Sequence, residues 1–153
     1  MTRLSIVIMA VPERKEMVYA LIKRLGRNVP VAWDYDYNGI WWNCLRAWKM
    51  VKGSATHHLI LQDDVLVCDD FIESAERAIS YRPNDFVGFY ANNQICTKAS
   101  ESGHSWVNIK NGVWGQTQML PVYEIPRFLS WCETNIDPTY KHDDRRLATY
   151  LSV

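Results

Sequence analysis

The sequence lacks a long hydrophobic run, an excess of charge of either sign and any closely paired cysteines. Its 153 residues include 17 basic and 17 acidic residues, and this balance gives no support for stable binding to nucleic acid or to an anionic membrane. No apolar run approaches the ~20 residues that a membrane-spanning helix needs. The opening MTRLSIVIMAVPERK returns to charged residues after a short apolar stretch, so we interpret it as a first strand rather than a signal peptide.

The four cysteines are widely spread, and none belongs to a C-x-x-C pair. This spacing is typical of neither a zinc site nor a disulfide framework, so we interpret them as reduced thiols and expect a cytoplasmic protein. Internal repeats, low-complexity tracts and linkers are also missing, whereas 48% of the residues are hydrophobic. A chain of this length and composition is most simply one domain, residues 1–153, with a core of its own.

Apolar runs and helical periodicities alternate along the chain. Six apolar segments predict strands: 4–11, 29–36, 57–62, 85–91, 105–109 and 112–120. Five segments with apolar residues at helical spacing predict helices: 12–25, 41–51, 71–79, 122–135 and 143–152. A polar loop is expected between Asn92 and Ser105. This alternation predicts an α/β fold with a mostly parallel central sheet flanked by helices.

Charged residues follow three of the predicted strands. Residues 12–14 follow the first strand, Asp34 and Asp36 close the second, and Asp63 and Asp64 close the third. In parallel α/β sheets, ligands bind in the crevice beyond the carboxyl ends of the strands. An Asp-Asp pair is common by chance, but the convergence of three such sets predicts a ligand site at this edge.

The two adjacent carboxylates suit a hard divalent cation, Mn²⁺ or Mg²⁺, which prefers oxygen ligands. Neighbouring side chains in an extended segment point to opposite faces, so we expect Asp64 to be the direct ligand. Asp63 would then contact a ribose or a water molecule in the outer coordination shell of the cation. The structural alternatives are strand-end and helix-cap carboxylates for this pair and turn chemistry before Asn38 for Asp34 and Asp36.

Five short segments occur in an order that resembles glycosyltransferases of the GT-A fold, in particular the large family-two group and small phage-encoded relatives. These segments are SIVIMAVPERKEMV, GIWWN, LILQDDV, NGVWGQ and HDDRRLATYL. In the family, the corresponding features are an opening strand and loop, a Gly-x-x-x-Asn helix start, a metal-binding acidic motif, a Gly/Trp segment, and an acidic pair followed by leucine. The resemblance covers nearly the whole chain and implies a single minimal GT-A domain with a Rossmann-like sheet.

The resemblance implies a metal-dependent transfer of a sugar from a nucleotide-sugar, with a UDP-sugar favoured, to an acceptor hydroxyl. The implied donor-binding residues are Ala10, Pro12, Arg14, Asp34, Asp36, Asn43, Asp63 and Trp114. Asp64, supported by Asp63, would hold the cation. Asp144 aligns with the general base, with Asp143 beside it, which implies inversion at the anomeric centre; a simple helix cap is the structural alternative for both.

Two departures from the family pattern modify these expectations. Gln62 stands where the family often has an acid, so metal binding is expected to rest on Asp64. The chain ends at Val153, where relatives usually continue and often supply a histidine ligand, which implies a truncated or minimal form. For a phage relative, the acceptor would be a virion protein, a modified DNA base or a glycan, and the location the host cytoplasm. Two alternatives stay open: a nucleotide-sugar-binding protein without turnover, and a metal-dependent phosphohydrolase or nucleotidyltransferase.

Overall fold

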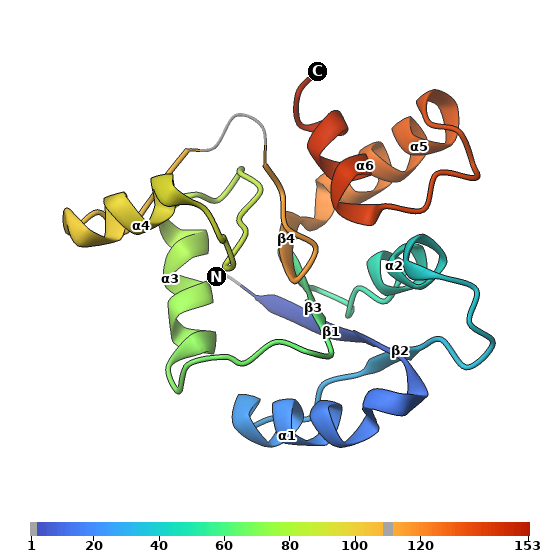
Figure 1. Cartoon of the computed structure of the whole chain (residues 1–153), viewed down its shortest axis with the longest axis horizontal. Helices are drawn as coiled ribbons and strands as arrows, with labels where there is room; N and C mark the ends of the chain where they lie inside the picture. The colour runs from blue at the N-terminus through green and yellow to red at the C-terminus, as the bar shows by residue number, and fades with distance from the viewer. Residues whose placement is uncertain (1–2, 109–111) are drawn as a thin grey trace.

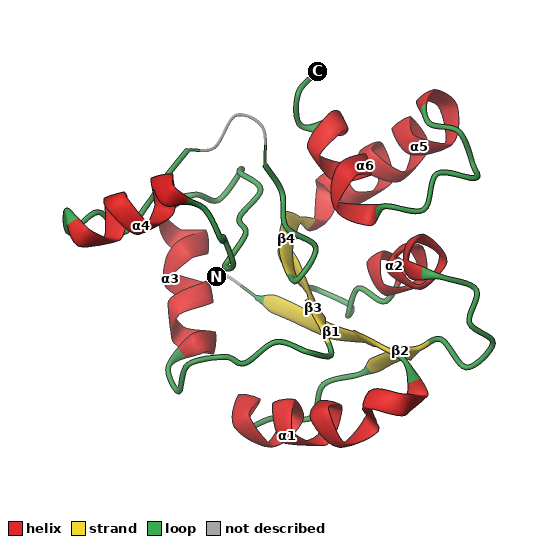
Figure 2. Cartoon of the chain, in the orientation of Figure 1, coloured by secondary structure: helices red, strands yellow, loops and turns green. Residues whose placement is uncertain are grey.

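Four short strands form one sheet, and helices cover both of its faces (Figures 1 and 2). The computed structural model describes residues 3–108 and 112–153. The strands are β1 (Leu4–Ala10), β2 (Val31–Trp33), β3 (His57–Gln62) and β4 (Thr117–Pro121). The helices are α1 (Lys15–Leu25), α2 (Ile40–Lys49), α3 (Phe71–Tyr81), α4 (Gln94–Glu101), α5 (Ile125–Asn135) and α6 (Asp143–Tyr150). Short 3-10 turns, η1 (Pro12–Arg14) and η2 (Val122–Glu124), precede α1 and α5.

The strand order is β2-β1-β3-β4. β1 pairs in parallel with β2 and with β3, as strands joined through helices do, whereas β4 runs antiparallel to β3. The α/β class predicted from the sequence is confirmed, and the sheet is mixed because its last strand reverses direction. Within the described ranges, none of the helices has the length and apolar character needed to cross a membrane.

The two central strands, β1 and β3, are buried on both faces. Successive side chains of a strand point to opposite faces, so alternate residues enter two separate cores. One core contains Ile8 and Leu61 with residues of α1 and α3, and the other contains Val7 and Ile60 with residues of α2, α5 and α6. This arrangement explains why both strands are continuous apolar runs in the sequence.

The predicted strand at 85–91 is wrong, because the segment pairs with the sheet through one residue only. Val87 exchanges two backbone hydrogen bonds with Met119 of β4, each 3.0 Å long. Two residues after Val87, the backbone amide of Phe89 donates to the side-chain hydroxyl of Thr117 instead of to a backbone carbonyl of β4. The ladder therefore stops after one bridge.

The predicted loop at 92–105 contains helix α4. Its start is fixed by Asn93, whose side chain accepts a hydrogen bond from the Cys96 amide at 2.8 Å. α4 buries none of its residues, so no packing against the core specifies this helix. The predicted strand at 105–109 is not formed over 105–108, and residue 109 lies outside the described residues. The strand predicted from 112 begins only at Thr117, after a turn at 115–116.

His58 is a buried histidine of β3 that links three elements. Its Nδ1 lies 3.0 Å from the hydroxyl of Ser5 in β1, and its Nε2 lies 2.9 Å from the carbonyl oxygen of Ala47 in α2. A carbonyl only accepts, so we assign the proton to Nε2, which donates to Ala47. Burial lowers the pKa of His58 below its usual 6.5, so the ring is neutral in the folded protein at neutral pH.

Acidification is expected to destabilise the fold through His58. Because the folded-state pKa is depressed, the stabilisation is complete above pH 6.5 and is lost as the pH falls through the folded-state pKa, since the unfolded chain takes up the proton first. His58→Gln should therefore lose less stability than the wild type between about pH 7 and pH 5 in urea unfolding. His57, whose pKa burial also lowers, is common to both proteins. Equal losses in the two proteins would show that His58 is not the titrating group.

Candidate functional site

The register of the parallel strands brings three chain segments to the same edge of the sheet. Ala10 of β1 is level with Trp33 of β2, and β3 ends beside Met9 of β1. The segments that leave β1, β2 and β3 therefore begin next to one another. Polar side chains from all three segments form the candidate site.

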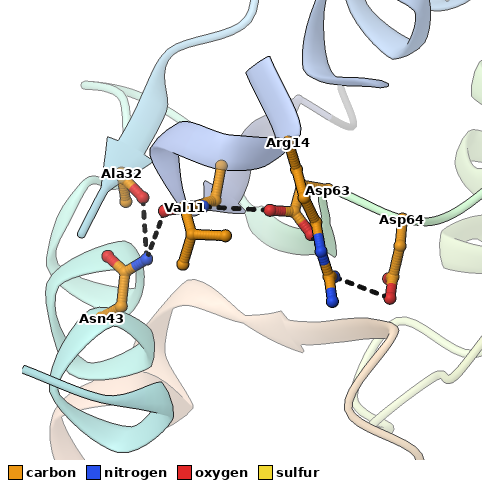
Figure 3. A network of polar contacts seen from close by, with 7 residues as sticks. Val11, Arg14, Ala32, Asn43, Asp63 and Asp64 are labelled. Carbon is orange, nitrogen blue, oxygen red and sulfur yellow. Dashed lines mark hydrogen bonds and ion pairs between the residues drawn. The ribbon is translucent and has the colours of Figure 1, made fainter. Parts of the chain in front are cut away.

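Asp63 is the buried acid at this edge. Only 4% of the residue is exposed, and each carboxylate oxygen has a partner: Oδ2 accepts from the Val11 amide at 3.0 Å, and Oδ1 accepts from Arg14 Nη1 at 2.9 Å (Figure 3). These contacts join the end of β3 to the loop and the η1 turn that follow β1. Asp63 thus fixes the geometry of the edge.

Asp64 shares the guanidinium of Arg14 with Asp63. Arg14 Nη1 also lies 2.9 Å from Asp64 Oδ2, so one nitrogen bridges the two carboxylates (Figure 3). The hydrogen bond and charge of Asp63, with a smaller contribution from Asp64, raise the pKa of Arg14. The expectation that the two acids point in opposite directions is wrong, because the strand ends at Gln62 and residues 63–64 form a turn.

Asp34 organises the loop between β2 and α2. It is buried, and its two carboxylate oxygens accept from the amides of Asn38 and Gly39, both at 2.9 Å. Burial acts to raise the pKa of Asp34, but these hydrogen bonds outweigh it and the pKa is lowered. Gly39 has φ +105°, a conformation that side chains rarely adopt, so glycine is required where α2 begins. Asp36 lies exposed in the turn before this contact.

Asn43 of α2 is buried beside the ends of β1 and β2. Its Nδ2 donates to the carbonyl oxygens of Ala10 at 3.1 Å and Ala32 at 2.9 Å (Figure 3). Its Oδ1 is buried and has no hydrogen-bond partner among the described residues. A hollow of about 160 Å³ adjoins this side chain and is lined by Val11, Asp34, Tyr37, Gly39, Ile40 and Asn43.

Tyr37 connects the two loops that border this hollow. Its hydroxyl donates to the carboxylate of Glu13, which lies in the turn that begins at Pro12. Tyr37 also adopts a positive φ of 54°, which is uncommon for a residue other than glycine. The hydrogen bond holds the β2–α2 loop against η1, where the sequence alone gave no reason to place Tyr37 or Glu13.

A second polar cluster lies at the end of β3, on the face covered by α2 and α6. Gln118 of β4 donates from Nε2 to Asp143 Oδ2 at 3.2 Å, and Asp143 is only 5% exposed. Burial raises the pKa of this carboxyl group. Gly115 packs against the same groups: a Cβ at this position would lie 2.9 Å from Gln62 Nε2 and 3.2 Å from Asp143 Oδ2. Any side chain at Gly115 would push these groups aside.

The structure separates the acidic pair at the start of α6. Asp143 points into the polar cluster, whereas Asp144 is half-buried and accepts from the amide of Arg145 at 2.7 Å. The helical spacing of Asp143 with the buried Arg146 and Leu147 is the sequence signal that places Asp143 on the inner face. Trp114, half-buried, immediately precedes Gly115 at the border of the same cluster.

Two glutamines that the sequence did not identify also belong to this polar cluster: Gln116 precedes β4, and Gln118 lies in it. Gln116 and Gln118 both have a buried Oε1 without a hydrogen-bond partner among the described residues. Their alternation with Leu120, which is buried against α2, α5 and α6, places them on the inner face of the sheet. That pattern was present in GQTQML and could have identified the cluster.

At this edge, the acidic pair would supply the oxygen ligands for a divalent cation. Over residues 3–108 and 112–153, no group of three or more His, Cys, Asp or Glu side chains is arranged to hold a metal ion. Asp63 and Asp64, however, already place two oxygens at 2.9 Å from one positively charged group. Mg²⁺ and its relatives are often held by one or two carboxylates together with substrate phosphates and water. The donor set therefore fits a cation that arrives with a phosphate ligand.

Comparison with models of known protein families, with curated protein sequences and with solved structures finds no match. The functional inference therefore depends on the chemistry and geometry of the two polar clusters at the sheet edge.

The two acids should differ in their contribution to stability. Asp63→Ala should lower the free energy of unfolding by about 1–3 kcal/mol, because it removes the acceptor of the Val11 amide as well as an ion pair. Asp64→Ala should cost less than about 1 kcal/mol, because it removes one partner of an exposed ion pair. Urea unfolding of both variants measures the difference. An equal cost would contradict the structural role of Asp63.

Proposed function

We propose that this chain is a metal-dependent glycosyltransferase of the GT-A type. It transfers a sugar from a nucleotide-sugar to an acceptor hydroxyl with inversion, and the sequence resemblance favours a UDP-linked donor. The observation that carries the proposal is the network at the sheet edge, where a strand-end amide, a guanidinium and two carboxylates meet (Figure 3). The ordered sequence motifs support the same assignment.

The hollow beside Asn43 supports a nucleoside-binding role. Its volume of about 160 Å³ is below the 300–1,000 Å³ of pockets for drug-sized ligands, so it suits one flat ring rather than a whole nucleotide. Asn43 Oδ1 and the Asp34 carboxylate supply acceptors for an N–H or ribose hydroxyl donor. A buried acceptor without a partner is costly, so a ligand donor would remove that cost.

The acid pair and Arg14 support binding of the diphosphate. Asp64, 40% exposed in its side chain, and Asp63 would hold Mn²⁺ or Mg²⁺ beside the phosphates. When bound, such a cation neutralises the negative charge that develops on a diphosphate leaving group. Arg14 adds a planar guanidinium suited to phosphate oxygens. The positive charges of the cation and of Arg14 would both stabilise the nucleoside diphosphate as the leaving group when its bond to the sugar breaks.

Asp144 is proposed as the general base that accepts the proton of the acceptor hydroxyl. A base must be reachable by the acceptor, and Asp144 is half-buried whereas Asp143 lies under Gly115 and Gln118. Asp143 is proposed to position the start of α6. Gln62 links the acid pair to the polar cluster around Asp143. Its side-chain amide lies against Gly115, and it immediately precedes Asp63 in the chain.

Nucleotide binding tests the proposal without knowledge of the sugar or acceptor. UDP with Mn²⁺ should stabilise the full chain against thermal unfolding, by about 2.7 kcal/mol at a ligand concentration 100 times Kd. Asp64→Asn should abolish the Mn²⁺-dependent part of this stabilisation. Asp69→Asn is the matched control, because Asp69 is an exposed acid paired with Arg24 away from the site. No stabilisation of the wild type by any nucleoside diphosphate with Mn²⁺ would refute the proposal.

Transfer should depend on Asp144 more than on Asp143. Asp144→Asn keeps the side-chain size but cannot accept the proton, so turnover should fall by roughly 10²–10⁴-fold while donor affinity is retained. Asp143→Asn should reduce turnover less per folded molecule. Turnover is measured as product formation with a panel of UDP-sugars and candidate acceptors. Donor affinity is measured by calorimetry. Full turnover by Asp144→Asn would exclude it as the base.

A further inference from the structure

Arg14 occupies the position between the two carboxylates that a divalent cation would take. The same nitrogen, Nη1, lies 2.9 Å from Asp63 Oδ1 and 2.9 Å from Asp64 Oδ2. The guanidinium cancels one of the two negative charges of the pair. A free divalent cation therefore meets a site with less negative charge and with a resident positive group, both of which weaken its binding.

Asp63 and Asp64 differ in their number of contacts and in their burial. Asp63 keeps a second contact, with the Val11 amide, and its side chain is 5% exposed. The Arg14 and Asp64 side chains are 46% and 40% exposed. Movement of Arg14 would thus leave Asp63 anchored and both carboxylates available, without disturbing the core.

A diphosphate is the ligand that would draw Arg14 away from the acids. Guanidinium groups bind phosphate oxygens with paired, charge-assisted hydrogen bonds. Arg14 lies in η1, directly after β1, at the same edge as the hollow beside Asn43. A nucleotide whose base occupies that hollow would bring its phosphates to the edge where Arg14 and the acid pair lie.

We infer that Arg14 is an exchangeable counter-cation that makes divalent-cation binding conditional on a nucleoside diphosphate. Without nucleotide, Arg14 neutralises the acid pair and keeps its affinity for free cations low. With nucleotide, the guanidinium moves to the diphosphate and the acid pair becomes a ligand for the cation. This inference rests on the proposed function, and it adds to it a specificity for the cation–diphosphate pair over either ligand alone.

Manganese binding to the full-length chain tests this inference directly. Free Mn²⁺ is measured by electron paramagnetic resonance, with and without UDP, for the wild type and for Arg14→Gln. In the absence of UDP, Arg14→Gln should bind Mn²⁺ at least about tenfold more tightly than the wild type, within the usual 5–150-fold range of coupling between two ligands. UDP should increase the Mn²⁺ affinity of the wild type by a larger factor than that of the variant.

Two further variants make the test specific. Arg24→Gln is the matched control, because Arg24 is a half-exposed arginine of α1 with a 2.9 Å ion pair to Asp69, and it should bind Mn²⁺ as the wild type does. Arg14→Lys retains the charge and should keep nucleotide-free Mn²⁺ affinity low. If Arg14→Gln does not fold, Arg14→Met replaces it as the uncharged variant. The comparison of Arg14→Lys with Arg14→Met then measures the effect of the same charge on Mn²⁺ affinity.

The outcomes separate this inference from the proposed function. If removal of the charge at Arg14 leaves nucleotide-free Mn²⁺ affinity unchanged, the counter-cation role is overturned, even where UDP and Mn²⁺ bind together to the wild type. If the charge-neutral variant gains Mn²⁺ affinity but UDP has no effect on any of the proteins, the exchange with diphosphate is overturned, and so is the nucleotide site of the proposed function. A gain of nucleotide-free Mn²⁺ affinity in Arg14→Gln, together with a UDP effect that is larger in the wild type than in this variant, supports both.

Discussion

The buried carboxylate of Asp63 is the interaction on which the arrangement of this edge depends. It accepts one hydrogen bond from the backbone where β1 ends and another from Arg14 in the following turn. A buried charge is costly unless it is paired and hydrogen-bonded, and here both conditions are met. The position of Arg14, and through it the closeness of Asp64, follows from this anchor. A turn directly after β3 is what allows adjacent acids to share one cation.

Three buried carboxylates at or near the carboxyl ends of the strands have different surroundings. Asp34 accepts hydrogen bonds from two amides of its own loop, and its pKa is lowered in spite of burial. Asp143 has an amide donor from Gln118, and burial raises its pKa. Asp63 is bound to a cationic side chain. In the proposed function, these surroundings correspond to the nucleoside, the acceptor side and the diphosphate, respectively.

The sequence was sufficient to predict the central strands and the meeting of their polar ends, because long apolar runs and strand-end acids are local signals. It was insufficient where the outcome depends on tertiary pairing. The segment 85–91 has the composition of a strand, yet Thr117 takes the amide of Phe89 and ends the ladder. Helix α4 buries none of its residues against the core. The shared contact of Arg14 with both acids joins residues about 50 positions apart, which no periodicity reveals.

The most direct test of the central claim is a crystal structure of the wild-type chain with UDP and Mn²⁺, with anomalous scattering recorded at the manganese edge. We expect an anomalous peak in contact with Asp64 and the diphosphate, the uracil ring in the hollow beside Asn43, and Arg14 moved from the acid pair to a phosphate oxygen. Manganese and nucleotide bound together at another surface, with Arg14 still bridging Asp63 and Asp64, would contradict it.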